Sequence, residues 1–159
     1  MASATVSGTE LRQSVGAFPS GVTVVTTSAG GVDHGLTVSA FVSLSLEPAM
    51  VLVSIDNSSR VLPFLQQGAP VAVSVLAEEQ KELAITFGRH LPDKFDGVSV
   101  ERGDSGVPVL SGAAAWFEGT VAERFAGGDH VIVTIAVEKC GNDQSLKPLL
   151  YHRGKLFDW

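Results

Sequence analysis

The sequence predicts a mainly β domain, in which antiparallel strands form a barrel and short helices cap its ends. Short runs rich in Val, Thr and Ser are separated by glycine-containing turns, a pattern typical of strands joined by hairpins. Helical patterns are few and do not alternate regularly with the strands, which disfavours a doubly wound parallel sheet. Hydrophobic residues make up 45% of the 159 residues, enough for one core that needs no disulfide or metal.

The N-terminal region is expected to hold a flexible tail and a short helix. Residues 1–8 are small and polar, so we expect them to be flexible and the folded domain to cover residues 9–159. Thr9 is a suitable N-cap for the helix. Three apolar residues are spaced to share one helix face: Leu11, Val15 and Phe18. Pro19 and the two residues after it end the helix in a turn.

The following segments predict three strands and a second short helix. Residues Val22–Thr27 form a β-branched run typical of a buried strand. Residues Leu36–Leu46 alternate with a period of two, which predicts one continuous strand with one apolar face. Met50–Ile55 predicts the next strand, and Arg60–Gln67 has the spacing of a helix.

The second half predicts one more helix and most of the remaining strands. Glu78–Phe87 is the clearest amphipathic helix, and the polar stretch Gly88–Gly106 is expected to form a mobile loop over another part of the molecule. A hairpin turn with two glycines separates the last two long strands. The strands expected in this half are Val71–Leu76, Ala113–Phe125, His130–Cys140, Leu149–Tyr151 and Lys155–Phe157.

Charge and cysteine content limit the partners and the compartment. A net charge of −6 repels phosphate backbones, so no nucleic-acid partner is expected. The 11 basic residues do not cluster, which argues against a membrane surface. The single cysteine, Cys140, excludes an intrachain disulfide and is expected to be buried in a strand. Neither a signal peptide nor an apolar run of about 18 residues is present, so we expect a cytoplasmic protein.

Several common kinds of site are absent from the sequence. The sequence contains no G-x-S-x-G motif, which disfavours hydrolysis by a nucleophilic serine. The four histidines are far apart and lack the spacing of a metal site, so no metal is expected. Rossmann and P-loop glycine patterns are also missing, so any dinucleotide must bind on another scaffold.

Two segments have compositions that favour a ligand. In Leu36–Ala40, hydroxyl groups alternate with small residues, which lets a flat ligand lie against the backbone. Ser54–Arg60 combines hydroxyls, a helix start and one arginine, a reasonable cradle for a phosphate. The alternative is that Asp56–Ser59 only cap the helix. His130 begins a strand after a turn, a position that is usually structural or solvated.

Taken together, these segments resemble the flavin reductase-like family, whose fold is the FMN-binding split barrel, and especially the short-chain reductases of two-component flavin monooxygenases. The order and spacing of the motifs carry the resemblance over about residues 10–159. The matching segments are Phe18–Val25, Gly35–Phe41 with Ser43, Glu47-Pro48, Gln80–Phe87, Gly106–Leu110 with Gly112–Ala115, Gly127–His130, Pro148–Tyr151 and Gly154. The chain departs from the family pattern at Ser74, often Asn in relatives, and at Ser20, often Thr.

The resemblance implies an antiparallel Greek-key split β-barrel and a set of site residues. Residues implied to hold the flavin are Leu36, Thr37, Val38, Ser39, Ala40, Ser43, Asp56, Asn57, Ser58, Ser59, Arg60, Phe87, Gly88 and Arg89. Residues implied to lie near the nicotinamide are Pro19, Ser20, His130, Tyr151, Gly154 and Phe157. His130 would be the catalytic residue, orienting the nicotinamide rather than donating a proton.

The resemblance also implies the activity and the partners. The expected reaction is hydride transfer from NADH, with NADPH possible, to FMN or FAD. A separate monooxygenase would receive the reduced flavin, and the reductase would be a homodimer. Two alternatives stay open: an electron-transfer reductase that retains its flavin and serves iron, cobalamin or a protein, and a non-enzymatic dimer that only binds flavin.

Overall fold

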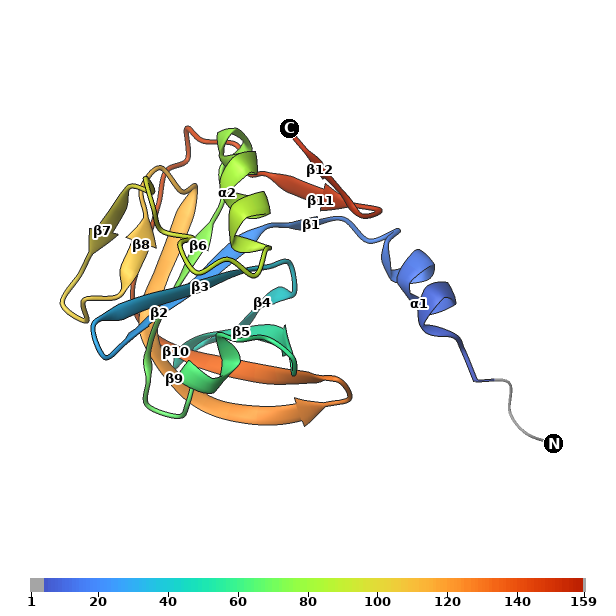
Figure 1. Cartoon of the computed structure of the whole chain (residues 1–159), viewed down its shortest axis with the longest axis horizontal. Helices are drawn as coiled ribbons and strands as arrows, with labels where there is room; N and C mark the ends of the chain where they lie inside the picture. The colour runs from blue at the N-terminus through green and yellow to red at the C-terminus, as the bar shows by residue number, and fades with distance from the viewer. Residues whose placement is uncertain (1–4, 159) are drawn as a thin grey trace.

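Antiparallel strands dominate residues 5–158, the range that the computed structural model describes (Figure 1). The expected mainly β class is therefore confirmed. The strands are β1 (Ser20–Gly21), β2 (Thr23–Ala29), β3 (Val32–Val38), β4 (Phe41–Leu46), β5 (Ala49–Asp56), β6 (Pro70–Val75), β7 (Val100–Arg102), β8 (Pro108–Leu110), β9 (Ala115–Gly127), β10 (His130–Asn142), β11 (Leu150–His152) and β12 (Lys155–Phe157). The helices are α1 (Gly8–Val15) and α2 (Lys81–Phe87), with 3₁₀ turns η1 (Leu62–Phe64) and η2 (Glu78–Gln80).

Seven of these strands form one sheet in the order β3-β2-β6-β9-β10-β5-β4. The long hairpin of β9 and β10 lies at its centre, and every neighbouring pair in the sheet is antiparallel. One core cluster takes buried side chains from β2, β3, β5, β6, β9 and β10, so the sheet wraps around a single interior. The sheet is a split barrel whose edge strands are β3 and β4.

The segment expected as one strand, Leu36–Leu46, is two strands at opposite edges of the sheet. β3 pairs with β2 as far as Val38, and β4 pairs with β5 from Phe41 onward. Ser39 and Ala40 between them are exposed and lie outside both ladders. The Ala40 carbonyl instead accepts a hydrogen bond from the Ser54 amide, 3.0 Å away. Alternation continues across the break, so the pattern alone predicted no interruption.

Around β2 both faces of the sheet are covered, which explains the run of consecutive buried residues in this strand. Successive residues of β2 point to opposite faces: Val25 packs in the barrel interior and Val24 in a second cluster with Ala84 and Phe87 of α2. All of these are buried. Helix α2 therefore covers the outer face beside β3, as Figure 1 shows.

The helices begin and end differently from the sequence prediction. Ser7, not Thr9, caps α1, because the Ser7 hydroxyl accepts from the Glu10 amide at 3.2 Å and the Glu10 carboxylate accepts from the Ser7 amide at 2.9 Å. Residues 7 and 8 of the expected flexible tail thus belong to the helix and its cap, and residues 1–4 lie outside the described range. Helix α1 projects away from the sheet (Figure 1).

The helix expected over Arg60–Gln67 is only the single 3₁₀ turn η1. The turn ends at Leu65, whose φ of −94° and ψ of 56° are not helical, and Gly68 at φ 85° follows the predicted helix. The stretch Gly88–Gly106 contains β7, which the sequence prediction missed together with its partner β8. Neither α-helix in the described range has the length and apolar character that crossing a bilayer would require.

Cys140 is exposed, whereas the sequence predicted a buried residue. It follows a register shift between Val137 and Lys139, where β10 and β9 leave the regular alternation. Beyond this irregularity the strand runs past the core, and Glu138 and Lys139 are exposed as well.

Candidate functional site

Two neighbouring cavities contain most of the residues that the sequence singled out. The cationic cavity, of about 700 Å³, is lined by residues 32–37, 56, 58–61, 64, 87–92, 94 and 95. The apolar cavity, of about 810 Å³, is lined by residues 12, 13, 15, 16, 18, 20, 39–42, 52, 54, 132, 151, 153 and 154.

The two cavities meet at the end of β3. Thr37 lines the cationic cavity and Ser39 lines the apolar one, with buried Val38 between them. Thr37 and Ser39 are separated by about 7 Å of extended chain. A ligand with a flat apolar part and an anionic tail is therefore able to occupy both cavities at once.

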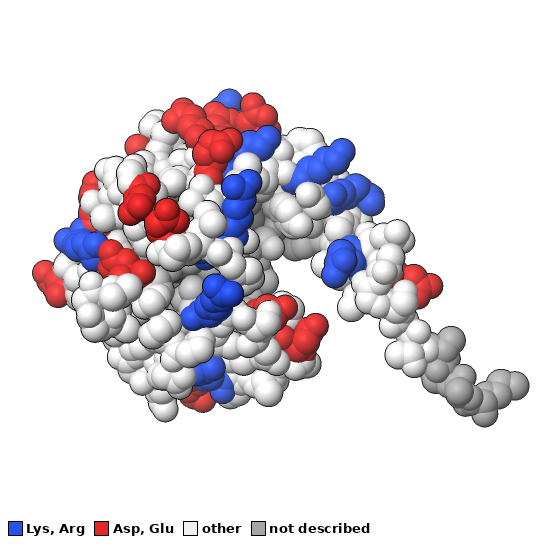
Figure 2. Space-filling model, viewed as in Figure 1, with Lys and Arg blue, Asp and Glu red and all other residues white. Residues whose placement is uncertain are grey.

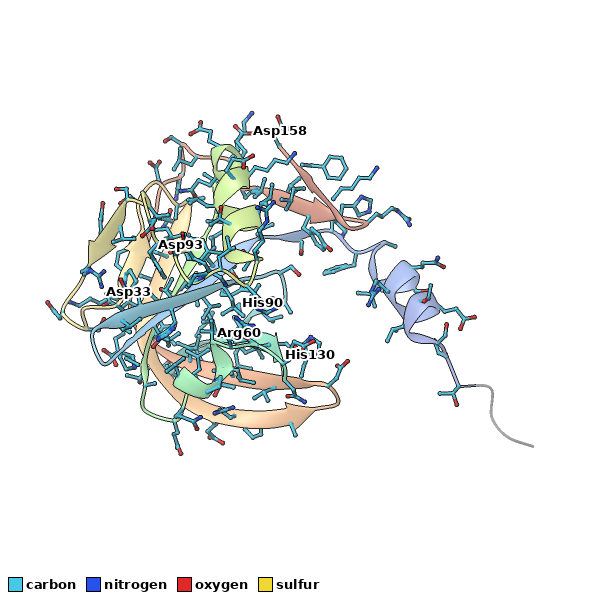
Figure 3. All side chains as sticks on the ribbon, in the orientation of Figure 1. Asp33, Arg60, His90, Asp93, His130 and Asp158 are labelled. Carbon is cyan, nitrogen blue, oxygen red and sulfur yellow. The ribbon has the colours of Figure 1, made fainter. Side chains whose placement is uncertain are left out.

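Arginine and lysine side chains give the cationic cavity its character. Figure 2 shows basic side chains around the opening below α2, whereas acidic ones gather above it. The three ion pairs found within residues 5–158 involve none of the cavity's basic groups. These groups are Arg60, Arg89 and Lys94, and Figure 3 labels Arg60 with His90 at the same opening.

Lys94 is the best anchored of these cations. Its Nζ donates to the carbonyl oxygens of Gly35, at 2.9 Å, and Phe87, at 3.1 Å. Burial and then the neighbouring charge of Arg60 lower the pKa of Lys94 below its ordinary value. An anion placed between these two cations would relieve their repulsion.

The two carboxylates of the cationic cavity already have partners. Asp33 accepts from Arg102 and from the Ser28 hydroxyl, and the hydrogen bond from Arg102 is the main reason that the pKa of Asp33 is lowered. Asp56 accepts from the hydroxyl and the amide of Ser58, at 2.7 and 2.8 Å, and these bonds lower the pKa of Asp56. Both side chains remain ionised and hydrogen bonded near neutral pH.

The loop after β5 offers fewer donors than the sequence suggested. Ser58 is bonded to Asp56, and the Asn57 amide donates to the Asp129 carbonyl at 3.0 Å. The Ser59 hydroxyl accepts from the Val61 amide at 3.2 Å, which leaves its proton available. Because η1 is one short turn, it provides no helix dipole. Ser59 and Arg60 are the donors of this loop that remain for an anion.

Helix α2 packs closely on β3, and residues of both elements form one wall of the cationic cavity. The Thr37 hydroxyl donates to the Ala84 carbonyl at 2.7 Å. A Cβ on Gly35 would lie 2.9 Å from the Phe87 ring and 3.2 Å from the Phe95 ring. Glycine at this position therefore lets β3 approach the edge-to-face ring pair of Phe87 and Phe95, whose centroids are 4.9 Å apart.

The apolar cavity lies between α1, the sheet and the small β1-β11-β12 sheet. Ser20 pairs in register with Tyr151, and the Arg153 amide donates to the Gly16 carbonyl at 3.1 Å, joining the two chain segments. Arg153 has a φ of 49° in the tight turn before Gly154. The apolar walls come from Val15, Phe18, Ala40, Phe41, Val42, Leu52 and Ile132.

His130 lies at the boundary of the apolar cavity without lining it. It pairs with Asp56, and Ile132 pairs with Ser54, so His130 and Ile132 share one face of β10. The His130 Nδ1 atom lies 2.7 Å from a carboxylate oxygen of Asp129. Figure 3 shows His130 at the hairpin end of β10. Nowhere in residues 5–158 do three His, Cys, Asp or Glu side chains gather as a metal site would require.

The predicted site residues divide between the two cavities. The cationic cavity contains Leu36, Thr37, Asp56, Ser58, Ser59, Arg60, Phe87, Gly88 and Arg89. The apolar cavity contains Ser20, Ser39, Ala40, Tyr151 and Gly154. Residues that line neither cavity are Pro19, Val38, Ser43, Asn57, His130 and Phe157.

Sequence reasoning missed other cavity residues. Lys94 lies in the expected loop Gly88–Gly106, and its isolated charge gave no signal of its own. His34 and Phe64 stack with centroids 3.8 Å apart and an interplanar angle of 11°, a contact between β3 and η1 that no spacing rule predicts. Arg12 and Arg153 come from opposite ends of the chain.

Comparison with known proteins identifies the family. A model of the flavin reductase like domain matches residues 15–159. The chain belongs to this family. It is 36% identical over 154 residues to the flavin-dependent monooxygenase reductase subunit HsaB of Mycobacterium tuberculosis, covering 96% of this chain and 82% of HsaB.

Two further family members differ in length. The NADH:FAD oxidoreductase SgcE6 of Streptomyces globisporus, solved with NAD and FAD fragments, has a TM-score of 0.89 at 32% identity over 95% of this chain and 92% of SgcE6. A Rhizobium meliloti protein named "Probable flavin reductase" is 40% identical over 148 residues and 92% of this chain. The chain spans about half the length of that relative, 47%.

Proposed function

We propose that the protein is an NAD(P)H-dependent flavin reductase that transfers hydride from NADH to FMN or FAD. The observation that carries the proposal is the junction at residues 37–39 of a flat apolar cavity with a cationic one. A flavin has this division, with an apolar ring system and a phosphate tail. Membership of the flavin reductase like domain family, and the NAD and FAD fragments bound to SgcE6, support the same ligands.

The residues present fit a flavin. The carbonyls of Ser39 and Ala40 accept from the amides of Phe41 and Ser54, whereas their own amides lie outside the strand ladders and would bond the polar edge of the ring. The Ser59 hydroxyl, Arg60 and Arg89 would hold the phosphate. The hydrogen bond from Thr37 to Ala84 would hold β3 against α2 where the ring and the phosphate of the flavin meet.

The nicotinamide would stack on the ring from the side of Ser20 and Tyr151, which pair across β1 and β11. When bound, flavin and nicotinamide supply the redox chemistry, a hydride passing from one ring to the other. The protein would align the two rings for this transfer and exclude water with its apolar walls. We assign His130 to orienting the nicotinamide.

Reduced flavin is proposed to leave for a separate monooxygenase, as the name of HsaB indicates for that relative. An exposed junction, with Ser39 and Ala40 at the surface, supports release. We also infer a cytoplasmic, homodimeric protein. The dimer is supported by exposed apolar side chains on α1 and on the edge strand β4: Leu11, Val15, Val42, Leu44 and Leu46.

Anaerobic oxidation of NADH and NADPH with riboflavin, FMN and FAD in turn tests the proposal. We expect rapid flavin bleaching with NADH and elution of the reduced flavin through a filter that retains the protein. Bleaching without elution would indicate the reductase that retains its flavin. Flavin binding without bleaching would leave only a binding protein and overturn the activity.

A further inference from the structure

We propose that the cationic cavity holds the adenosine diphosphate end of FAD, so that the protein prefers FAD to FMN. The inference rests on the proposed function, which leaves the two flavins equal. It deepens that function by assigning Lys94, His34 and Phe64 to the part of FAD that FMN lacks.

The cationic cavity is longer than a single phosphate requires. The cationic cavity follows β3 from Thr37, at the junction, back to Val32. From Thr37 to His34 the strand covers about 10 Å. A single phosphate next to Arg60 would fill only the near part of a cavity of about 700 Å³. The remaining length suits a second phosphate followed by a nucleoside.

Hydrogen-bond donors and cations follow one another along the cationic cavity in the order that two linked phosphates would need. Ser59 and Arg60 follow β5 and reach the phosphate that FMN and FAD share. Lys94 lies farther along, bonded to the carbonyl of Gly35. It is partly buried and has no carboxylate partner among the ion pairs of the described chain. A lysine held by two carbonyls keeps one N–H for the second phosphate.

Beyond Lys94, two aromatic rings form a wall of the cationic cavity. The rings of His34 and Phe64 lie nearly parallel and both line the cavity. Phe64 is 38% exposed, so its ring is accessible to a ligand. Flat rings beside cations are what an adenine with its phosphates requires, because the base stacks while the charges are neutralised.

The same adenosine diphosphate group occurs in NADH, so the test must separate the two sources. Continuity with the Ser59–Arg60 loop favours FAD, because in FAD the second phosphate and the adenosine are joined covalently to the flavin phosphate that this loop would hold, and the charges of Arg60 and Lys94 are close enough to interact. If NADH used the cavity instead, substitutions there would raise the KM for NADH and leave the ratio of FAD to FMN affinity unchanged.

The experiment is calorimetric titration of the full chain with FMN, FAD and ADP, together with steady-state kinetics. We expect FAD to bind at least about tenfold more tightly than FMN, and ADP to bind alone and compete with FAD. Lys94→Met should weaken FAD and ADP by about tenfold and leave FMN within about twofold. His34→Ser, which keeps both lysine contacts, should weaken FAD and ADP by about threefold to tenfold.

Lys139→Met is the matched control, because Lys139 forms an exposed ion pair with Asp104 outside both cavities. It should change none of the affinities. Equal binding of FMN and FAD with no binding of ADP, in a protein that reduces both flavins, would overturn the inference and leave the proposed function intact. Lysine-dependent ADP binding without any flavin reduction would support the cavity assignment and refute the activity.

Discussion

His130 lies at the boundary of the apolar cavity beside two carboxylates, Asp129 and Asp56. The contact of its Nδ1 atom with Asp129 fixes the ring, and its side chain is 40% exposed. Because His130 is assigned to orienting the nicotinamide, His130→Ala should lower kcat with NADH by about tenfold to a hundredfold. It lines neither cavity, so flavin affinity should stay nearly unchanged. Asp129→Asn, which keeps the ring but alters its partner, should have a smaller effect. Unchanged steady-state kinetics in His130→Ala would contradict the role.

Asp33 gives a pH-dependent contribution to stability. Its hydrogen bonds from Arg102 and Ser28 join β3 to β7 and β2, and they lower its pKa in the folded protein. A carboxyl with a lowered folded pKa stabilises the fold above its unfolded pKa of about 3.9, and this stabilisation is lost as the pH falls below that value.

Thermal unfolding between pH 3 and 7 measures this effect. Asp33→Asn should lower Tm near neutral pH and flatten the fall of Tm below about pH 4, because the titrating group is gone. The effect should be modest, since Arg102 is largely exposed. Asp143→Asn is a useful comparison, because the Asp143 carboxylate accepts only from Ser145, within its own turn. A wild-type slope in Asp33→Asn would refute the assignment.

At the scale of the elements, β3 packs closely against α2 and the loop after it. Gly35→Ala would place a methyl group against the rings of Phe87 and Phe95, neither of which is the free end of a flexible chain. We expect a loss of about 1–3 kcal/mol in unfolding free energy, measured by denaturant titration. Gly21→Ala is the control, because a Cβ there meets nothing within 4 Å. Equal losses in both variants would contradict this view of the packing.

Element prediction succeeded where one periodicity ran between clear turns. The β12 prediction, Lys155–Phe157, matches its observed bounds, and the long β9–β10 hairpin was expected within a few residues. It was wrong for Leu36–Leu46, because alternation records which residues are apolar and not which strand each one pairs with. It was also wrong for Arg60–Gln67, where the chain leaves the helical conformation at Leu65 after a single turn.

The site was predictable only where a local pattern carried it. The segment Leu36–Ala40 was expected from its hydroxyls and small side chains, and it does line both cavities. Lys94 could not be found, because its role depends on carbonyls of Gly35 and Phe87 that come together only in the fold. Expected roles in binding stay predictions until ligands are measured.

At the scale of the whole molecule, α1 is the feature that a single chain explains least. Leu11 and Val15 on this projecting helix are 57% and 60% exposed, and Phe18 after it is 80% exposed. A second copy would cover them and stabilise the pair through apolar burial. Leu11→Glu should therefore shift the protein toward monomer, measured by light scattering across a concentration series.

The control for this dimer prediction is Thr9→Glu, which adds the same charge to α1 at an exposed position on the side of the helix away from Leu11 and Val15. It should leave the dimer in place. A wild-type protein that remains monomeric at every concentration would refute the homodimer.

The two-residue link Ser39–Ala40 limits how far the barrel can open. Only three peptide units join Val38 at one rim of the sheet to Phe41 at the other, so these rims can separate there by no more than about 10 Å. Loosening of the interior cannot move β3 and β4 farther apart at this point, because the length of the peptide link sets the limit. We therefore expect a bound molecule to enter and leave on either side of the Ser39–Ala40 link. Inserting a few residues into this link would widen the opening between β3 and β4 without changing the core.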